Sequence, residues 1–248
     1  MVDPILAILV VFIAFLYASV GFGGASGYLA AMSLYNIPAS IAASTALLLN
    51  VVVAGIAFFH FTRSGHLKPR LLWPFILASI LAAFIGGNFQ LSQLAYQALL
   101  NLILLYVGLR MLLSNDKDHP DRQYRLPSLS LAMMTGAGLG LVSGMVGVGG
   151  GIFLSPLIQL FWWGDSKQAS ASSAGFILLN SLSGLAGRYF GDTLHFGEMG
   201  LFLIPLGIGG GVVGSYLGAR RFSNRRVQRL LGFILLITVF RFLVSLIG

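Results

Sequence analysis

Two glycine clusters, each inside a long apolar run, constrain this chain more than any other feature. The first lies at residues 21–27, with the sequence Gly-Phe-Gly-Gly-Ala-Ser-Gly, and the second at residues 147–151, with the sequence Gly-Val-Gly-Gly-Gly. Glycine costs a helix interior roughly 1 kcal/mol relative to alanine, so each cluster predicts a break in a helix. At membrane depth a broken backbone is tolerated only inside protein or beside a watery cavity. Duplicated broken segments therefore indicate the binding site of a transporter.

Composition places the chain among membrane proteins. Of its 248 residues 57% are hydrophobic and 9% are charged, with a mean hydropathy of +0.89, whereas soluble domains average about 25% charged residues. We expect a polytopic protein of the inner cell membrane, embedded in the lipid bilayer. The net charge of +8 does not indicate nucleic-acid binding, because the basic residues lie in short loops between apolar runs. No removable signal peptide is expected, and the absence of cysteine excludes disulfides and thiolate metal sites.

Eight apolar segments make up the chain, and the first and fifth contain the glycine breaks. They are Pro4–Val20 with Ala25–Tyr35, Ala39–Phe61, Leu71–Gln90, Leu94–Leu113, Ser128–Val146 with Ile152–Trp163, Ala169–Phe190, Met199–Ala219 and Val227–Ile247. The halves repeat, because Leu99–Arg110 aligns without gaps with Leu230–Arg241 and Pro74 matches Pro205 in the same register. We predict an N-terminal repeat at 1–113, a polar cytoplasmic linker at 114–127 and a C-terminal repeat at 128–248, together forming one membrane domain.

The distribution of Lys and Arg predicts how the repeats are oriented. Basic residues gather at 63–70, 110–125 and 220–229, and cytoplasmic loops carry the excess of Lys and Arg. The simplest arrangement makes each glycine-broken pair a re-entrant helical hairpin, which leaves three full crossings in each half. Three is odd, so the chain would be an all-α protein of two inverted repeats, with both termini outside. Eight full crossings are the alternative, because the fifth segment is nearly long enough to span the membrane.

The glycine breaks are the predicted substrate site. A short helix that starts at each break would direct its N-terminal N–H groups and positive dipole end towards mid-membrane, where they bind an anion without a charged side chain. Small hydroxyl clusters open the helices that follow the breaks, and an asparagine lies one to two turns further along each. The predicted substrate-binding residues are Gly23, Gly24, Ser44, Thr45, Asn50, Gly149, Gly150, Ser172, Ser173 and Asn180. The alternative is close helix packing and interhelical hydrogen bonding.

Charged side chains are placed away from the middle of the segments. All seven acidic residues lie near segment ends, whereas intramembrane carboxylates are the usual proton relays of pumps. This placement argues against an acid relay, a multi-carboxylate cation site and the acid–base pair of a hydrolase. No metal site, cofactor or enzymatic activity is predicted. His60 and Arg188 lie at matching ends of two segments, where they could draw anions into two vestibules; interfacial snorkelling is the alternative.

Both halves resemble the TauE/SafE family. The likeness is carried by Ser19–Gly24 and Met145–Gly151, each followed by an Ala-Ser-Thr/Ser-Ala segment, and its most specific string is Gly144–Pro156. It covers the whole chain, although Ala25–Tyr28 departs from the second-half pattern, so the two half-sites need not be equivalent. Proteins of this family, also called the toluene sulfonate uptake permease group, are sulfite and organosulfonate exporters.

The resemblance implies a secondary transporter that exports small sulfur-containing anions such as sulfite, sulfoacetate or other organosulfonates. Alternating access around the two glycine breaks would move the substrate. An anion channel of the same architecture is an alternative, and so are a membrane enzyme and a structural scaffold. The sequence leaves homo-oligomerisation open.

Overall fold

The computed structural model describes residues 3–89, 91–113, 124–196, 199–222 and 224–247. Within these ranges every regular element is an α-helix, as the sequence predicts. The helices are α1 (Pro4–Ser19), α2 (Ala25–Leu34), α3 (Ala39–Arg63), α4 (Pro69–Asn88), α5 (Gln93–Leu113), α6 (Leu129–Val146), α7 (Gly151–Leu160), α8 (Ser166–Phe190), α9 (Met199–Arg220) and α10 (Asn224–Ile247). Residues 114–123 of the predicted linker lie outside the described residues.

Both glycine clusters interrupt the helix in which they lie. The first separates α1 from α2, which begins directly after Gly24, and the second separates α6 from α7, which begins directly after Gly150. The φ angles are 101° at Gly24 and 74° at Gly150. A Cβ strongly disfavours this left-handed backbone. Glycine at these two positions therefore sets where the second helix of each pair starts.

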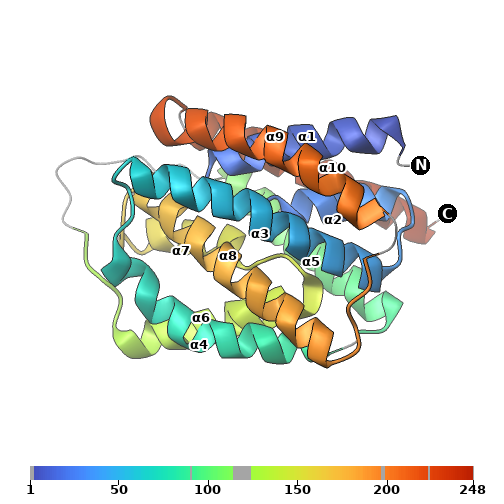
Figure 1. Cartoon of the computed structure of the whole chain (residues 1–248), viewed down its shortest axis with the longest axis horizontal. Helices are drawn as coiled ribbons and strands as arrows, with labels where there is room; N and C mark the ends of the chain where they lie inside the picture. The colour runs from blue at the N-terminus through green and yellow to red at the C-terminus, as the bar shows by residue number, and fades with distance from the viewer. Residues whose placement is uncertain (1–2, 90, 114–123, 197–198, 223, 248) are drawn as a thin grey trace.

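The two halves of the chain are interleaved. α1 packs along α9 and α6 packs along α4, so a helix of each glycine-broken pair lies against a helix of the other half (Figure 1). α3 packs against α8 between these two layers, and α5 packs against α10. Neither half therefore buries its helices without the other.

Glycines spaced four residues apart allow this close packing. On α6 they are Gly136, Gly140 and Gly144, facing α4, and on α9 they are Gly210, Gly214 and Gly218, facing α1. At each position an added Cβ would overlap a backbone carbonyl oxygen of the facing helix. Residues four apart lie on one helix face, and small residues on such a face let membrane helices approach closely. Much of the glycine outside the breaks therefore serves packing between the halves.

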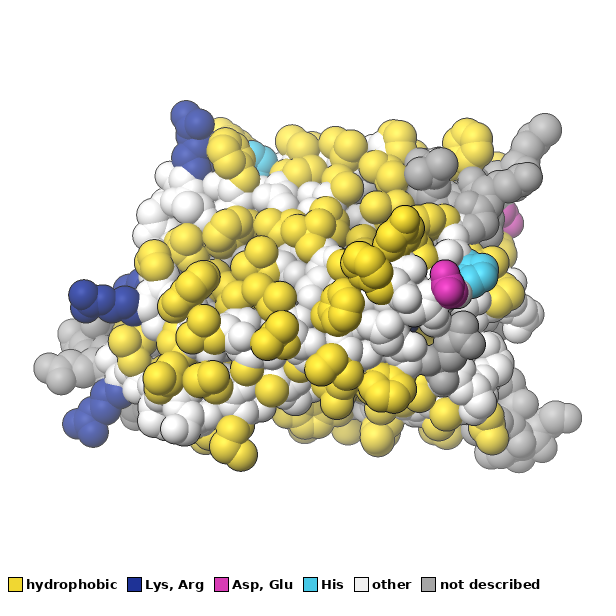
Figure 2. Space-filling view, turned by 60° about the horizontal axis from the view of Figure 1, so that its bottom comes forward, with side chains coloured by type: hydrophobic (Ala, Val, Ile, Leu, Met, Phe, Trp, Pro, Cys, Tyr) yellow, Lys and Arg dark blue, Asp and Glu magenta, His cyan; other side chains and the backbone are white. Residues whose placement is uncertain are grey.

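Apolar side chains cover much of the outside of the bundle (Figure 2). Among the described residues, five helices are long and apolar enough to cross a membrane: α3, α4, α5, α6 and the Phe202–Arg220 part of α9. α1 and α7 are apolar but shorter. α8 is long, rich in serine and glycine, and largely buried by its neighbours. These features are those of a multi-pass membrane protein whose more polar helix lies inside.

Charges are separated between the two ends of the bundle. The Lys and Arg side chains visible in Figure 2 lie at one end, and the visible acidic side chains lie at the other. At the basic end the His66 ring lies 3.0 Å from the carbonyl oxygen of Ala219, which joins the connection after α3 to the last turn of α9. We refer to this as the basic end and to the other as the opposite end.

The two ends of each glycine-broken pair are in contact. Before α6 and after α7, the N–H of Arg125 donates to the carbonyl of Trp162 at 3.2 Å. Asp3, directly before α1, lies beside Tyr35, directly after α2. The pKa of the Tyr35 hydroxyl is raised by partial desolvation, by the negative charge of Asp3 and by a hydrogen bond with Asp3. α1 begins and α10 ends at the same end of the molecule (Figure 1).

Candidate functional site

Asn50, near the middle of α3, connects the two glycine breaks. Its side-chain oxygen accepts a hydrogen bond from the N–H of Ala25 at 3.1 Å, and its side-chain nitrogen donates to the carbonyl of Val148 at 3.2 Å. Ala25 is the first residue of α2, and Val148 lies in the second break. Asn50 is 0% exposed. One uncharged amide therefore holds both breaks together inside the protein.

Gly23 and Gly149 both lie against Asn50 and against Ile177 of α8. A Cβ added at Gly23 would overlap the Asn50 oxygen, and one added at Gly149 would lie 2.5 Å from the Asn50 nitrogen. The same two Cβ positions are 3.0 and 2.9 Å from Ile177. The structure therefore brings three of the predicted site residues together, Gly23, Asn50 and Gly149, and only glycine fits at the two break positions.

The second half does not repeat the Asn50 arrangement. Asn180, predicted as its counterpart, donates its side-chain nitrogen to the carbonyl of Phe176 in its own helix at 2.9 Å. The buried side-chain oxygen of Asn180 has no hydrogen-bond partner. On α8 the residue that lies against both breaks is the apolar Ile177. The two halves therefore contribute different chemistry to the centre.

Four buried serine hydroxyls on α6 and α8 have no hydrogen-bond partner. They belong to Ser143, Ser172, Ser173 and Ser181, each 0% exposed. The Ser181 hydroxyl would lie 3.2 Å from a Cβ at Gly149. Buried polar groups are nearly always paired, so this cluster is unusual. Ser172 and Ser173 are among the residues predicted from the sequence, whereas Ser143 and Ser181 are not; Ser181 lies four residues after Ile177, on the same helix face.

Tyrosine hydroxyls lie beside the first break, and sequence reasoning missed them because aromatic residues in an apolar run are usually core. The hydroxyl of Tyr28 would lie 2.7 Å from a Cβ at Gly24, and it is buried without a partner. Ser26 donates to the hydroxyl of Tyr17 at 3.0 Å. Neither α2 nor α7 has a side-chain hydrogen bond from its N-cap glycine. In their first turns the N–H of Ala25 binds Asn50, and those of Gly151 and Phe153 bind the carbonyls of Gly149 and Gly150.

Ser44 and Thr45 bind the connection between α8 and α9. The Ser44 hydroxyl donates to the Ser40 carbonyl at 2.9 Å and accepts from the N–H of His195 at 3.3 Å. Thr45 donates to the carbonyl of Phe196 at 3.4 Å. The structure therefore places these two predicted residues where they fasten a connecting segment to the first turns of α3.

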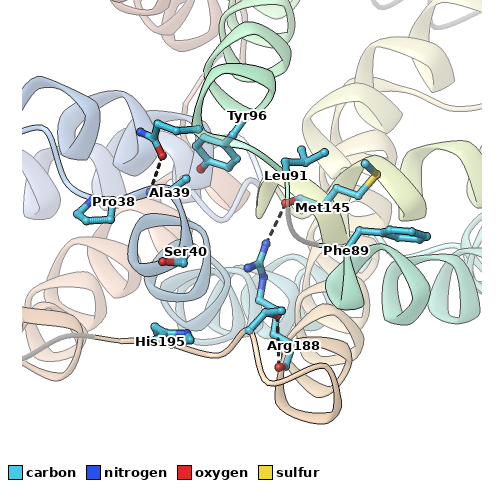
Figure 3. A pocket seen from close by; sticks show the side chains of 11 residues that line it. Pro38, Ala39, Ser40, Phe89, Leu91, Tyr96, Met145, Arg188 and His195 are labelled. Carbon is cyan, nitrogen blue, oxygen red and sulfur yellow. Dashed lines mark hydrogen bonds between the residues drawn. The ribbon is translucent and has the colours of Figure 1, made fainter.

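A cavity of about 300 Å³ lies at the opposite end of the bundle (Figure 3). Polar lining residues include Arg188, Tyr96 and His195, and apolar ones include Phe89 and Leu91. It lies between the start of α3, the ends of α4 and α8 and the start of α5.

Arg188 and Tyr96 both bind the last turn of α6. The guanidinium Nη2 of Arg188 donates to the carbonyls of Gly144 and Met145 at 3.1 and 2.9 Å. The hydroxyl of Tyr96 donates to the carbonyl of Val146 at 3.3 Å. Arg188 is 4% exposed, so it is enclosed by protein and does not snorkel to an interface.

His60, the other predicted vestibule residue, lies towards the basic end of α3. Its ring Nδ1 is 2.7 Å from the hydroxyl of Ser215, and its ring packs edge-on against Tyr216. His60 and Arg188 therefore lie towards opposite ends of the bundle, and only Arg188 lines the cavity at the opposite end.

A sequence model of the family described as "Sulfite exporter TauE/SafE" matches residues 6–242. The chain belongs to this family. It is also 34% identical over 235 residues to the "Probable membrane transporter protein y4hK" of Sinorhizobium fredii (strain NBRC 101917 / NGR234), a match that covers 94% of this chain and 95% of that protein. No solved structure matches the chain. The TauE/SafE resemblance seen in the sequence is confirmed, and the chain is a membrane transporter of this type.

The TauE/SafE match includes both glycine breaks, Asn50 and Arg188. Around the breaks the available groups are backbone N–H groups, an amide and hydroxyls, which bind oxygen atoms without adding charge to the interior. Among the described residues, no group of three or more His, Asp or Glu side chains could hold a metal ion. The chemistry at the centre of this TauE/SafE protein is therefore hydrogen bonding by uncharged groups.

Proposed function

We propose that this protein is a secondary transporter that exports small sulfur-containing anions, such as sulfite, sulfoacetate or other organosulfonates, across the inner cell membrane. The observation that carries the proposal is the Asn50 bridge between the two breaks. The Asn50 oxygen accepts the Ala25 N–H, which is the donor that an anion at the N-terminus of α2 would use. An anion that took this position would displace Asn50 and weaken its second bond, to Val148. Binding would thereby separate the two breaks.

In this proposal the halves are inverted repeats, and each glycine-broken pair enters from and returns to one side. The contact between Arg125 and Trp162 supports this for α6 and α7, and the proximity of Asp3 to Tyr35 supports it for α1 and α2. With the basic end in the cytoplasm, both termini are outside. Alternating access rocks one repeat against the other around the breaks.

The driving force in this proposal is the substrate gradient together with the membrane potential. A potential that is negative inside favours the exit of an anion by about 2.3 kcal/mol per charge and per 100 mV. The transport cycle uses no cofactor, no nucleic acid and no catalytic side chain. Its partners are the anionic substrate and the lipid bilayer.

Flux measurements on purified protein in liposomes test the proposal. Sulfite and p-toluenesulfonate efflux should saturate and show counterflow in the wild type and in the control Asn101→Ala, which loses only a bond within α5. Asn50→Ala removes the two bonds through which anion binding would separate the breaks, and Gly149→Ala places a Cβ 2.5 Å from the Asn50 nitrogen. Each should lower flux by about tenfold, which corresponds to about 1.4 kcal/mol. Saturable flux that both variants leave unchanged would contradict the site, and absence of flux would contradict the function. Flux without saturation or counterflow would identify a channel.

A further inference from the structure

Arg188 differs from the exposed basic residues Lys68, which directly precedes α4, and Arg70, which lies in the first turn of α4. It is 4% exposed and lines the cavity at the opposite end of the bundle. Figure 3 shows its guanidinium directed from α8 towards the end of α6, at the edge of the cavity. Nη2 donates to two carbonyls, and the buried Nε has no hydrogen-bond partner.

The charge of Arg188 has no counterion among the described residues, since its guanidinium donates to two backbone carbonyls. Burying a charge without a paired opposite charge is costly, and carbonyls at a helix C-terminus supply only partial negative charge. Arginine presents five donors in a planar fork that matches two oxygens of a carboxylate, phosphate or sulfonate. An anion in the cavity would supply both the missing charge and an acceptor for Nε.

The cavity suits a small organic anion. Its volume of about 300 Å³ is at the lower end of the range usual for small-molecule sites. Tyr96, Ser40 and His195 add polar groups to the wall near Arg188, while Phe89 and Leu91 provide apolar surface for a short alkyl or aryl part.

The same side chains that line the cavity hold the second break in place. Arg188 binds the carbonyls of Gly144 and Met145, and Tyr96 binds that of Val146, so these two residues bind consecutive carbonyls of the last turn of α6. The next residue begins the second glycine cluster, in which Asn50 binds Val148. An anion that draws the guanidinium into the cavity therefore competes directly with the bonds that fix the end of α6.

We propose that this cavity is a second anion subsite, distinct from the site between the breaks, in which Arg188 exchanges the α6 carbonyls for an organic sulfonate and so releases the second break. The inference rests on the proposed function, because the anion is the transported substrate. Occupation of the subsite loosens the last turn of α6 and exposes residues of the break.

Because the chain contains no cysteine, Val148→Cys introduces a single reporter thiol at a position that is 3% exposed. We expect saturating benzenesulfonate to accelerate maleimide labelling of this thiol in the full-length detergent-solubilised protein by about tenfold. In the Arg188→Gln background the labelling rate should no longer depend on the anion. Arg188→Lys, which keeps the charge but loses the fork, should retain a weaker dependence. Arg70→Gln, the matched control at an exposed basic position, should behave as the parent does.

Calorimetric binding of benzenesulfonate separates this inference from the proposed function. Two classes of site are expected, of which Arg188→Gln should remove one and Gly149→Ala, whose Cβ would fill the space beside Asn50 and Ile177, should remove the other. If Arg188→Gln and Arg188→Lys leave both binding and labelling unchanged while liposome flux still depends on Asn50, the subsite is wrong and the proposed function stands. If the wild type neither binds benzenesulfonate nor transports any sulfur anion, both are wrong.

Discussion

Replacing Asn50 by alanine should loosen the contact between the two breaks measurably. The side chain makes two buried hydrogen bonds, to the Ala25 N–H at 3.1 Å and to the Val148 carbonyl at 3.2 Å, and its removal leaves both backbone groups unpaired. An unpaired buried group costs about 1–3 kcal/mol, whereas interhelical hydrogen bonds in membranes average about 0.6 kcal/mol. Two such bonds place the loss of unfolding free energy between about 1 and 6 kcal/mol. Because both groups are enclosed by protein, we expect about 2–3 kcal/mol.

Equilibrium unfolding in mixed detergent micelles measures this loss, and two other asparagines provide the comparison. Asn180→Ala removes one bond within α8 and an oxygen that already lacks a partner. Asn101→Ala removes one bond within α5, where the side chain is only partly buried. Both should cost clearly less than Asn50→Ala. If Asn50→Ala lowers the free energy of unfolding no more than Asn180→Ala does, the bonds to Ala25 and Val148 contribute nothing net and the reasoning fails.

Three further predictions concern packing, binding and orientation. Gly144→Ala should lower the free energy of unfolding by roughly 1–3 kcal/mol, because the added Cβ would overlap a carbonyl of α4. Gly138→Ala in the same helix, where a Cβ would have nothing within 4 Å, should raise the free energy of unfolding by up to about 1 kcal/mol. Equal unfolding midpoints for the two variants would contradict this account. Ser181→Ala removes a buried hydroxyl without a partner, so the unfolding midpoint should stay near that of the wild type. Sulfite binding, measured by calorimetry, should weaken several-fold. A large drop in the unfolding midpoint would instead show that the hydroxyl has a structural role. Cysteines introduced at Lys68 and Gln93, both exposed, should react with a membrane-impermeant maleimide from opposite sides of oriented vesicles, and reaction from one side alone would exclude the proposed orientation.

The parts of the fold that the sequence could predict are those determined locally. Gly24 and Gly150 adopt positive φ, which only glycine does readily. A glycine cluster in an apolar run therefore predicts a helix break at its own position. Long apolar runs likewise predict helices. The packing role of Gly144 is not local, because it depends on which helix lies opposite, and α6 meets α4 from the other half of the chain.

The centre of the site could be predicted only in part for the same reason. The position of Asn50 after the first break predicts that it belongs to the site, but its bond to Val148 crosses between the halves and has no sequence signal. Symmetry predicts the same role for Asn180, but in the structure its amide nitrogen binds within its own helix, and Ile177 is the residue of α8 that lies against both breaks. Arg188 lies at the end of an apolar segment, and at such a position the sequence is the same whether the side chain extends to the interface or is buried by protein.

Hydrogen bonding is unevenly distributed around the two breaks, and this unevenness favours the binding of an anion beside the second break. The Ala25 N–H is paired with Asn50, whereas the buried hydroxyls of Ser173 and Ser181 and the oxygen of Asn180 are unpaired. Unpaired buried groups raise the free energy of this arrangement, so an anion that accepts hydrogen bonds from the two hydroxyls removes part of that penalty. A ligand shifts a two-state equilibrium only through such a difference in affinity. Because more of the unpaired groups lie on the second half, the groups beside the second break are those that gain most from a bound anion.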